Sequence, residues 1–171
     1  NIEKLNLENA GVETHKRGIT VNASQQTNVP HIYALGDVTG GLLFTHSASH
    51  QASTFIRKAI FHLPAKTDFS VFPWVTYTDP ELASVGLNEQ EARKKGIPYK
   101  LAEAKFNDID RAKAEGEQCG KIKVLIEPSK CRGLGGGKML GAHIVGPNAG
   151  ELIHEYVVAM NAGEKASPRR G

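Results

Sequence analysis

Three segments in the second half of the sequence alternate apolar and polar residues, and an amphipathic segment follows them. A period of two predicts strands with one buried face, whereas apolar residues at spacings of three and four predict a helix. The strands are expected at 99–106, 120–128 and 139–146, and the helix at 148–163, where Gly163 ends it. Successive strands followed by a helix indicate an α+β domain with an antiparallel sheet and flanking helices.

Further elements of the same domain are expected just upstream of residue 99. Two short strands are predicted at 75–78 and 83–86, with an Asp-Pro turn between them. Asn88 and Glu91 have the spacing of a capping box, so a short helix is expected to begin there.

The first part of the sequence has a different pattern. Strands are predicted at 18–23 and 32–35, and apolar residues recur at helical spacing from Thr45 to about Phe61. A loop rich in small and charged residues, 64–70, then separates this part from the antiparallel domain.

These patterns divide the chain into two domains and a tail. We assign residues 1–66 to the first domain, 67–163 to the second, and 164–171 to a basic tail that we expect to be disordered. The first residue is Asn1, and the sequence stops soon after the last predicted helix. We therefore expect the chain to be a piece of a longer protein.

Composition and charge exclude some classes of function. The 171 residues carry a formal net charge of +3, and the basic clusters are not interleaved with aromatic residues, which argues against nucleic-acid binding. No stretch is apolar for the roughly 18 residues that a membrane span needs, and no signal peptide is apparent. Cys119 and Cys131 fit neither a zinc knuckle nor a close redox pair, so we predict ordinary thiols in a cytoplasmic protein.

Residues 31–40 read HIYALGDVTG, in which a predicted strand runs into Gly36 and Asp37 and a helix follows at Thr45. Nucleotide-type ligands are held at such strand-to-helix connections, where an acid can accept hydrogen bonds from sugar hydroxyls. The start of the helix would favour electron-rich ligand atoms. Alternatively, Asp37 is a turn residue that caps its own loop.

Three long segments of the sequence resemble one family of enzymes. TNVPHIYALGDVTGGLLFTHSASHQA resembles the second flavin-contacting segment of the FAD-dependent pyridine nucleotide-disulfide oxidoreductases. FPWVTYTDPELASVGLNEQEA and MLGAHIVGPNAGELIHEYVVAMNAG resemble the beginning and the later strand and helix of the dimerisation domain of the same family. Mercuric reductase and lipoamide dehydrogenase are the branch to which the chain is most similar. The first domain would then be a remnant of the FAD-binding α/β domain.

The resemblance implies a set of cofactor-binding residues. Asp37 would bond the ribityl chain of FAD, and Leu43, Phe44, Thr45 and His46 match the start of the helix whose backbone amides face the flavin. Those amides would stabilise the negative charge that the reduced flavin carries.

The resemblance also implies what the chain would not do alone. The redox Cys-x4-Cys pair, the dinucleotide fingerprints and the catalytic His-Glu segment of the family have no counterpart in this sequence. We therefore predict a homodimerisation module of an enzyme that moves electrons from NAD(P)H through FAD to a disulfide or metal ion. Residues 1–66 could exchange between the two chains of the dimer. The alternative is a non-enzymatic module that keeps FAD or a nucleotide at Asp37 and the Thr45 helix.

Two groups of residues have spacings compatible with a metal. His46 and His50 are four residues apart on a predicted helix, and Glu151, His154 and Glu155 lie within one turn of another. We favour a structural reading of both groups, because the first lies at the predicted flavin end and the second on the predicted interface helix. No metal site is therefore predicted.

Overall fold

The computed structural model describes residues 2–128 and 137–166 of the chain. The chain divides into two compact units, and the boundary between them falls after Asp68. None of the helices in the described part is both long and apolar enough to cross a membrane.

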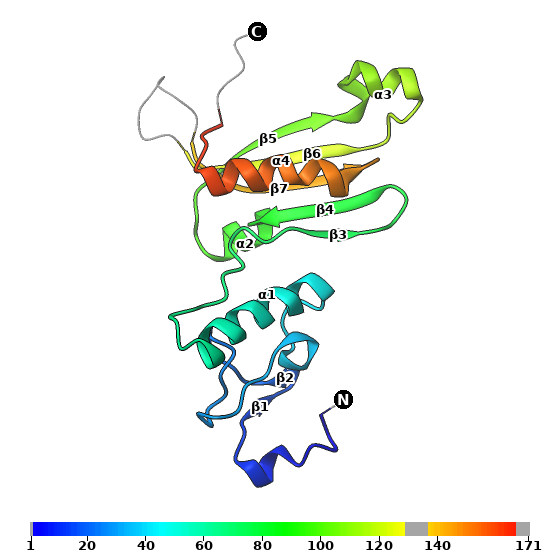
Figure 1. Ribbon diagram of the computed structural model, residues 1–171. Helices are drawn as coiled ribbons and strands as arrows, with labels where there is room; N and C mark the ends of the chain where they lie inside the picture. Colours follow the sequence, from blue (N-terminus) through cyan, green and yellow to red (C-terminus); the bar gives the residue numbers. More distant parts are fainter. Residues whose placement is uncertain (1, 129–136, 167–171) are drawn as a thin grey trace. The chain divides into compact units, whose positions relative to one another are not determined.

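The second unit is built on a five-stranded antiparallel sheet with the order β3-β4-β7-β6-β5 (Figure 1). The last strand of the chain, β7, therefore lies at the centre of the sheet. The strands are β3 (Trp74–Thr76), β4 (Glu81–Gly86), β5 (Lys100–Lys105), β6 (Lys121–Ile126) and β7 (Met139–Gly146). The α+β class and the antiparallel sheet predicted from the sequence are confirmed.

Helix α4 (Ala149–Ala162) lies against one face of this sheet, over β4 and β7 (Figure 1). The core between helix and sheet consists of small and branched apolar side chains, which allow a close approach: Ala83, Val85, Ala142, Ile144, Ile153 and Met160. Leu152 of the same helix is 36% exposed. The apolar face of α4 is thus wider than the part that the sheet covers.

Residues that alternate with the core residues point to the other face of the sheet. Ser84, His143 and Lys123 are direct cross-strand neighbours on β4, β7 and β6. Two of the hydrogen bonds of His143 are 3.0 Å long, one between Nδ1 and Ser84 Oγ and one between Nε2 and the Leu87 carbonyl oxygen. This side chain therefore ties β7 to β4 and to the segment that leaves β4.

Helix α2 (Glu89–Lys94) follows β4 and begins with the predicted capping box. The Asn88 side chain accepts a hydrogen bond from the Glu91 amide, and the Glu91 carboxylate accepts one from the Asn88 amide. This reciprocal pair satisfies two backbone donors that a helix start would otherwise leave open.

The connection between β5 and β6 contains two elements that the sequence analysis did not predict. They are a 3-10 turn, η4 (Phe106–Asp108), and a six-residue helix, α3 (Asp110–Glu115). The Phe106 ring is buried against Gly120 and Gly146, where an added Cβ would lie 2.8 Å and 2.6 Å from ring carbons. These two glycines therefore make the space for the ring.

The first unit has little regular structure before its helix. It contains a 3-10 turn, a two-stranded hairpin, a second 3-10 turn, a helix and a π-helical turn: η1 (Leu7–Ala10), β1 (Thr14–His15), β2 (Gly18–Ile19), η2 (Gly36–Thr39), α1 (Thr45–Phe55) and η3 (Ile56–Ile60). Its small core is formed by Val12, Ile19 and Ala34.

The strand predicted at 18–23 is shorter in the structure, and residues 32–35 do not form a strand. The first ends at Ile19, because the Asn22 side chain accepts hydrogen bonds from two following amides and builds a turn. In the second, Tyr33 makes a single bridge to Gln26. Gln25 has a φ of 65°, and this left-handed residue interrupts the extended backbone that a ladder needs.

Two further predictions concern residues at the edges of the described part. Cys131 lies outside the described residues. The tail was predicted to be disordered from residue 164, but residues 164–166 are described and make contacts. Lys165 forms an antiparallel β-bridge with Lys138, and the Ala166 amide donates a hydrogen bond to the Gly137 carbonyl oxygen.

Candidate functional site

The Gly-Asp motif lies in the first unit as the 3-10 turn η2. The turn is closed by a hydrogen bond of 2.9 Å from the Gly40 amide to the Asp37 carbonyl oxygen, and one of 2.8 Å from Thr39 Oγ1 to the Gly36 carbonyl oxygen. Backbone groups and a threonine hydroxyl thus close the loop, and the Asp37 side chain is exposed. The carboxylate is available to a ligand.

Glycines allow this turn to lie directly against the hairpin β1–β2. A Cβ added to Gly18 would lie 2.1 Å from the Val38 carbonyl oxygen, and one added to Gly40 would lie 2.5 Å from that of Arg17. Gly40 also has a φ of 68°, in the left-handed region that glycine favours. The position of Asp37 is therefore set by backbone-to-backbone contact.

The turn is anchored to helix α1 by a residue that the sequence analysis missed. The Gly36 amide donates a hydrogen bond to Oε1 of Gln51, and a Cβ added to Gly36 would lie 3.4 Å from the Ala48 Cβ. Gln51 is buried together with Ser47 and Thr54. Polar residues at i, i+4 and i+7 are the signal in the sequence that marks this buried side of the helix.

The side chains that α1 buries are therefore not the apolar ones whose spacing predicted a helix. The buried side chains are polar, whereas Ile56 and Ile60 are exposed in η3, at 44% and 61%. Because the first unit offers few apolar partners to the helix, hydrogen bonding decides which side faces inward.

The predicted flavin-facing residues come together at the start of α1. Phe44 occupies the N-cap position and has no side-chain oxygen to accept from the first amides. Leu43, Thr45 and His46 are exposed around it, with Leu43 at 59%. In the first turn, the Ser47 hydroxyl is fully buried and has no hydrogen-bond partner among the described residues.

These residues fit part of an FAD molecule. An exposed carboxylate on a fixed turn suits a polyol chain, and an accessible helix start suits the electron-rich edge of a flavin ring. When bound, FAD would supply two-electron redox chemistry, with Asp37 and the first turn of α1 as holding groups. The chain has no glycine-rich fingerprint for the diphosphate.

The histidines that could suggest a metal are accounted for by other contacts. The His46 ring lies 5.4 Å from the Phe44 ring, and His50 Nε2 lies 3.2 Å from the Asp68 carbonyl oxygen. His154 Nδ1 lies 2.9 Å from the Gly150 carbonyl oxygen. Across residues 2–128 and 137–166, no three His, Cys, Asp or Glu side chains gather as a metal would require.

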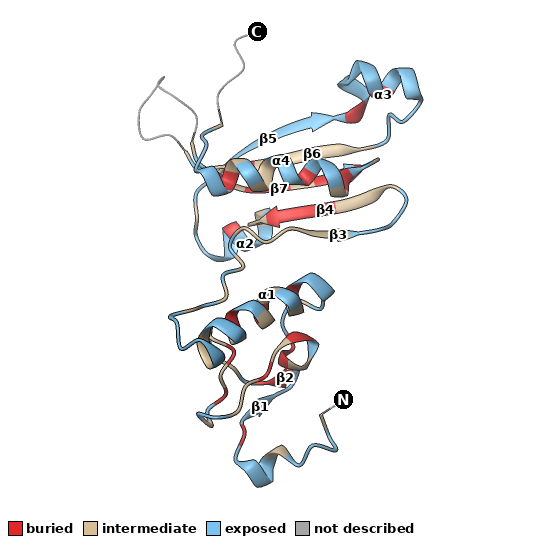
Figure 2. Ribbon diagram, viewed as in Figure 1, coloured by how far each residue is buried: buried red, intermediate tan, exposed pale blue. Residues whose placement is uncertain are grey.

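In the second unit, α4 leaves part of one sheet face uncovered. Figure 2 shows β5 exposed along its length and β6 half-buried, whereas β7 and β4 include buried residues. On that face β5 presents Ala102 and Ala104, opposite Val124 and Ile122 of β6. We call these four residues, with Leu152 and Tyr156 of α4, the open sheet face.

Leu152 and Tyr156 belong to this surface because of the way α4 sits on the sheet. Gly150 lies beside β3, since its added Cβ would be 3.3 Å from Val75 side-chain carbons. At about 100° per residue, Leu152 and Tyr156 lie on the other side of the helix, toward β6 and β5. Partial burial raises the pKa of the Tyr156 phenol, and the neighbouring Glu155 carboxylate adds to the effect.

Family models match both parts of the chain. The dimerisation domain of the pyridine nucleotide-disulphide oxidoreductases matches residues 72–169, and a second model of the same family matches residues 1–52. The members are FAD-dependent enzymes that use NAD(P)H.

Curated relatives include dihydrolipoyl dehydrogenases from distant organisms. The chain is 38% identical to that of Chlamydia muridarum over 156 residues, which cover 91% of this chain and 32% of the relative. It is 40% identical to a mitochondrial enzyme of Arabidopsis thaliana over 152 residues, 88% of this chain and 29% of the relative. The chain thus spans about a third of the length of the relatives it matches.

Solved structures of the same class share the fold. LpdA from Mycobacterium tuberculosis aligns with a TM-score of 0.80 at 25% identity, over 95% of this chain and 34% of that one. The HOCl-induced flavoprotein disulfide reductase RclA from Escherichia coli aligns with a TM-score of 0.76 at 26% identity, over 94% and 36%. The chain therefore belongs to the pyridine nucleotide-disulphide oxidoreductase family, and residues 72–169 correspond to its dimerisation domain.

Proposed function

We propose that this chain pairs with a second copy of itself as the dimerisation module of an FAD-dependent NAD(P)H:disulfide or metal-ion oxidoreductase. The observation that carries the proposal is the open sheet face, which lies within the domain that matches the dimerisation model. Homodimer interfaces are more apolar than the rest of a protein surface and commonly bury upwards of about 2,000 Å².

Electron transfer by the chain alone is not part of the proposal. The sequence has two cysteines, Cys119 and Cys131, at a spacing that differs from the Cys-x4-Cys redox pair of the family. The dithiol that would pass electrons from the flavin to a disulfide has no counterpart among them.

The first unit supports an exchange of residues 1–66 between two chains. Ile56, Ile60, Phe61 and Leu63, in η3 and the segment after it, are all at least 44% exposed. Exposed large apolar side chains favour association with another surface. A second copy of the chain supplies such a surface.

A second candidate function is retention of FAD or a nucleotide by the first unit, without catalysis. It is favoured by the exposed Asp37 carboxylate on its fixed turn and by the exposed first residues of α1, Thr45 and His46.

Light scattering across a size-exclusion peak, with flavin absorbance recorded on the same run, separates these functions. A colourless particle of twice the 18.5 kDa chain mass supports dimerisation. A colourless monomer excludes it. A yellow peak supports the second candidate, and an Asp37→Asn variant should then lose most of the colour.

A further inference from the structure

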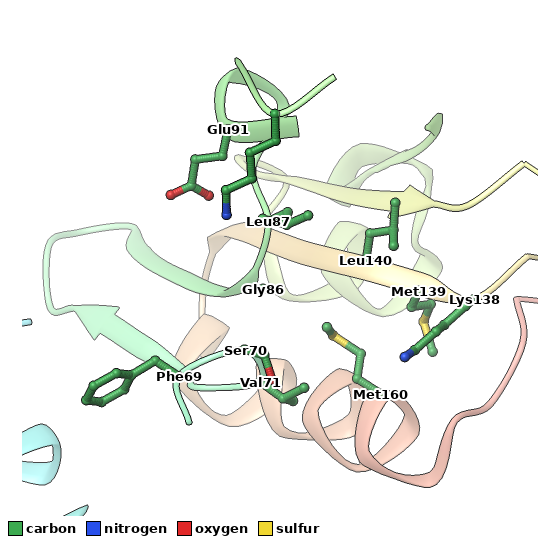
Figure 3. A pocket seen from close by; sticks show the side chains of 11 residues that line it. Phe69, Ser70, Val71, Gly86, Leu87, Glu91, Lys138, Met139, Leu140 and Met160 are labelled. Atoms are coloured by element: carbon green, nitrogen blue, oxygen red, sulfur yellow. The ribbon is translucent and has the colours of Figure 1, made fainter. Parts of the chain in front are cut away.

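A groove of about 480 Å³ opens at one end of the second unit. It is lined by residues that precede β3, follow β4 and begin β7, together with α2 and the end of α4 (Figure 3). This volume falls in the range of pockets that hold small organic molecules, roughly 300–1,000 Å³. The groove is separate from the open sheet face.

The floor of the groove is apolar and polarizable. Val71, Leu140, Met139 and Met160 line it, and these two methionines are the only ones in the chain. Figure 3 shows the Met139 and Met160 side chains directed into the same space. Methionine adapts to the shape of a hydrocarbon chain more readily than branched residues do.

Two lysines give the groove a positive rim. Lys95 and Lys138 both line it, and within the described residues neither has a carboxylate oxygen within 4 Å, whereas Lys113, Lys121 and Lys123 all do. Figure 3 shows the Lys138 amine turned toward Met160.

The one acidic residue that lines the groove is already engaged. The Glu91 carboxylate accepts a hydrogen bond of 3.1 Å from the Asn88 amide, as part of the capping box of α2. That hydrogen bond comes from a neutral amide and leaves the negative charge of Glu91 in place, so two lysines against one carboxylate give the lining of the groove a net charge of +1.

We infer that this groove binds a small amphipathic carboxylate, with its hydrocarbon tail over the two methionines and its head group at the lysine-lined rim. An apolar floor alone would accept neutral ligands, and lysines alone would accept inorganic anions. Their combination selects a molecule that carries both a tail and a negative charge. The inference depends on neither dimerisation nor flavin binding.

Calorimetric titration of the full chain with octanoate tests the inference. Octanoate should bind saturably, and butyrate and 1-octanol should each bind about tenfold more weakly, because each lacks one of the two recognised features. The Lys95→Gln/Lys138→Gln double variant should lose about tenfold in octanoate affinity, and the affinity for 1-octanol should not change.

Lys94→Gln is the matched control. Lys94 precedes Lys95, is exposed and does not line the groove. The inference is overturned if octanoate does not bind the native chain, if butyrate binds equally well, or if Lys94→Gln weakens binding as much as the double variant.

Discussion

Nζ of Lys123 on β6 lies 2.7 Å from Oε1 of Glu89, the first residue of α2. The other oxygen of the same carboxylate accepts a hydrogen bond of 3.2 Å from the Tyr99 hydroxyl. Glu89 thus connects α2 to the sheet on the face opposite α4. The hydrogen bond from Lys123 is the main reason why the pKa of Glu89 lies below its ordinary value.

Lys123→Gln should lower the thermal unfolding midpoint at neutral pH. A carboxylate whose pKa is lower in the folded chain than in the unfolded chain stabilises the fold at pH values above its unfolded pKa, about 4.3. This stabilisation is lost as the pH falls through the pKa of the folded state. The difference between the native chain and Lys123→Gln should therefore shrink as the pH falls below about 4.3 and Glu89 becomes protonated in the folded chain. Thermal unfolding followed by circular dichroism from neutral to acidic pH measures it.

Lys113→Gln serves as the control for this prediction. Lys113 pairs with Asp110 at 3.3 Å within α3, and the side chains are 49% and 100% exposed. Solvent screens such a pair strongly, so its loss should shift the midpoint less than the loss of Lys123. Equal shifts would contradict the role assigned to Glu89.

Gly18→Ala should destabilise the first unit by about 1–3 kcal/mol. The new methyl group would lie 2.1 Å from the Val38 carbonyl oxygen, so the hairpin and the turn that carries Asp37 would have to separate. Urea unfolding, followed by a probe in the first unit, gives the free energy of unfolding.

Gly41→Ala tests whether the effect comes from the close contact. Gly41 lies in the same loop, and its added Cβ would meet Thr39 Oγ1 at 3.8 Å, an ordinary contact distance. The variant should be nearly as stable as the native chain. A similar loss for both variants would show that any side chain in this region is harmful, whatever its neighbours.

The sequence predicts the second unit well because its elements have a strong period and clear ends. Apolar and polar residues alternate in β6 and β7, which identifies these strands. The capping box of Asn88 and Glu91 marks the start of α2, and Gly163 marks the end of α4. The connection η4–α3 was missed, because its six-residue helix is mostly charged and its one large buried side chain, Phe106, lies outside that helix.

The first unit is less predictable because its local patterns compete with tertiary contacts. Alternating apolar residues at 18–23 and 32–35 indicate strands, yet Asn22 and Gln25 adopt turn conformations and end them. Asp37 and Thr45 were located from their motif and their resemblance to a family. Gln51, which holds their loop, belongs to no motif and is evident only from its hydrogen bond to Gly36.

Tyr156→Phe should change how stability depends on alkaline pH. Burial raises the pKa of this phenol, so the neutral form is favoured in the folded state. Such a group contributes stability below its unfolded pKa, about 10, and the contribution is lost as the pH rises through the folded value. The native chain should therefore lose more stability than Tyr156→Phe as the pH rises above about 10.

Urea midpoints for both proteins across this range measure the difference. Dimerisation through the open sheet face would bury Tyr156 further, so the difference should grow with protein concentration. Tyr77→Phe is the control, since Tyr77 is 84% exposed and Phe removes the same hydroxyl there. Parallel pH curves for all three proteins would refute the prediction.

Leu152→Glu should convert the proposed dimer into a monomer. The side chain is 36% exposed at the border between α4 and the open sheet face. A carboxylate there would have to leave water when two copies meet, without a partner to compensate its charge. The dissociation constant of the dimer should rise at least about a hundredfold, which sedimentation equilibrium can measure.

Leu101→Glu distinguishes an effect on the interface from a general effect of a new charge. Leu101 is 38% exposed on β5, but it alternates with Ala102 and Ala104 and therefore points to the opposite face of the sheet. If the open sheet face is the dimer interface, Leu101→Glu leaves the chain dimeric. If Leu101→Glu dissociates the dimer and Leu152→Glu does not, the two copies meet through the opposite face, and the assignment of the open sheet face is wrong.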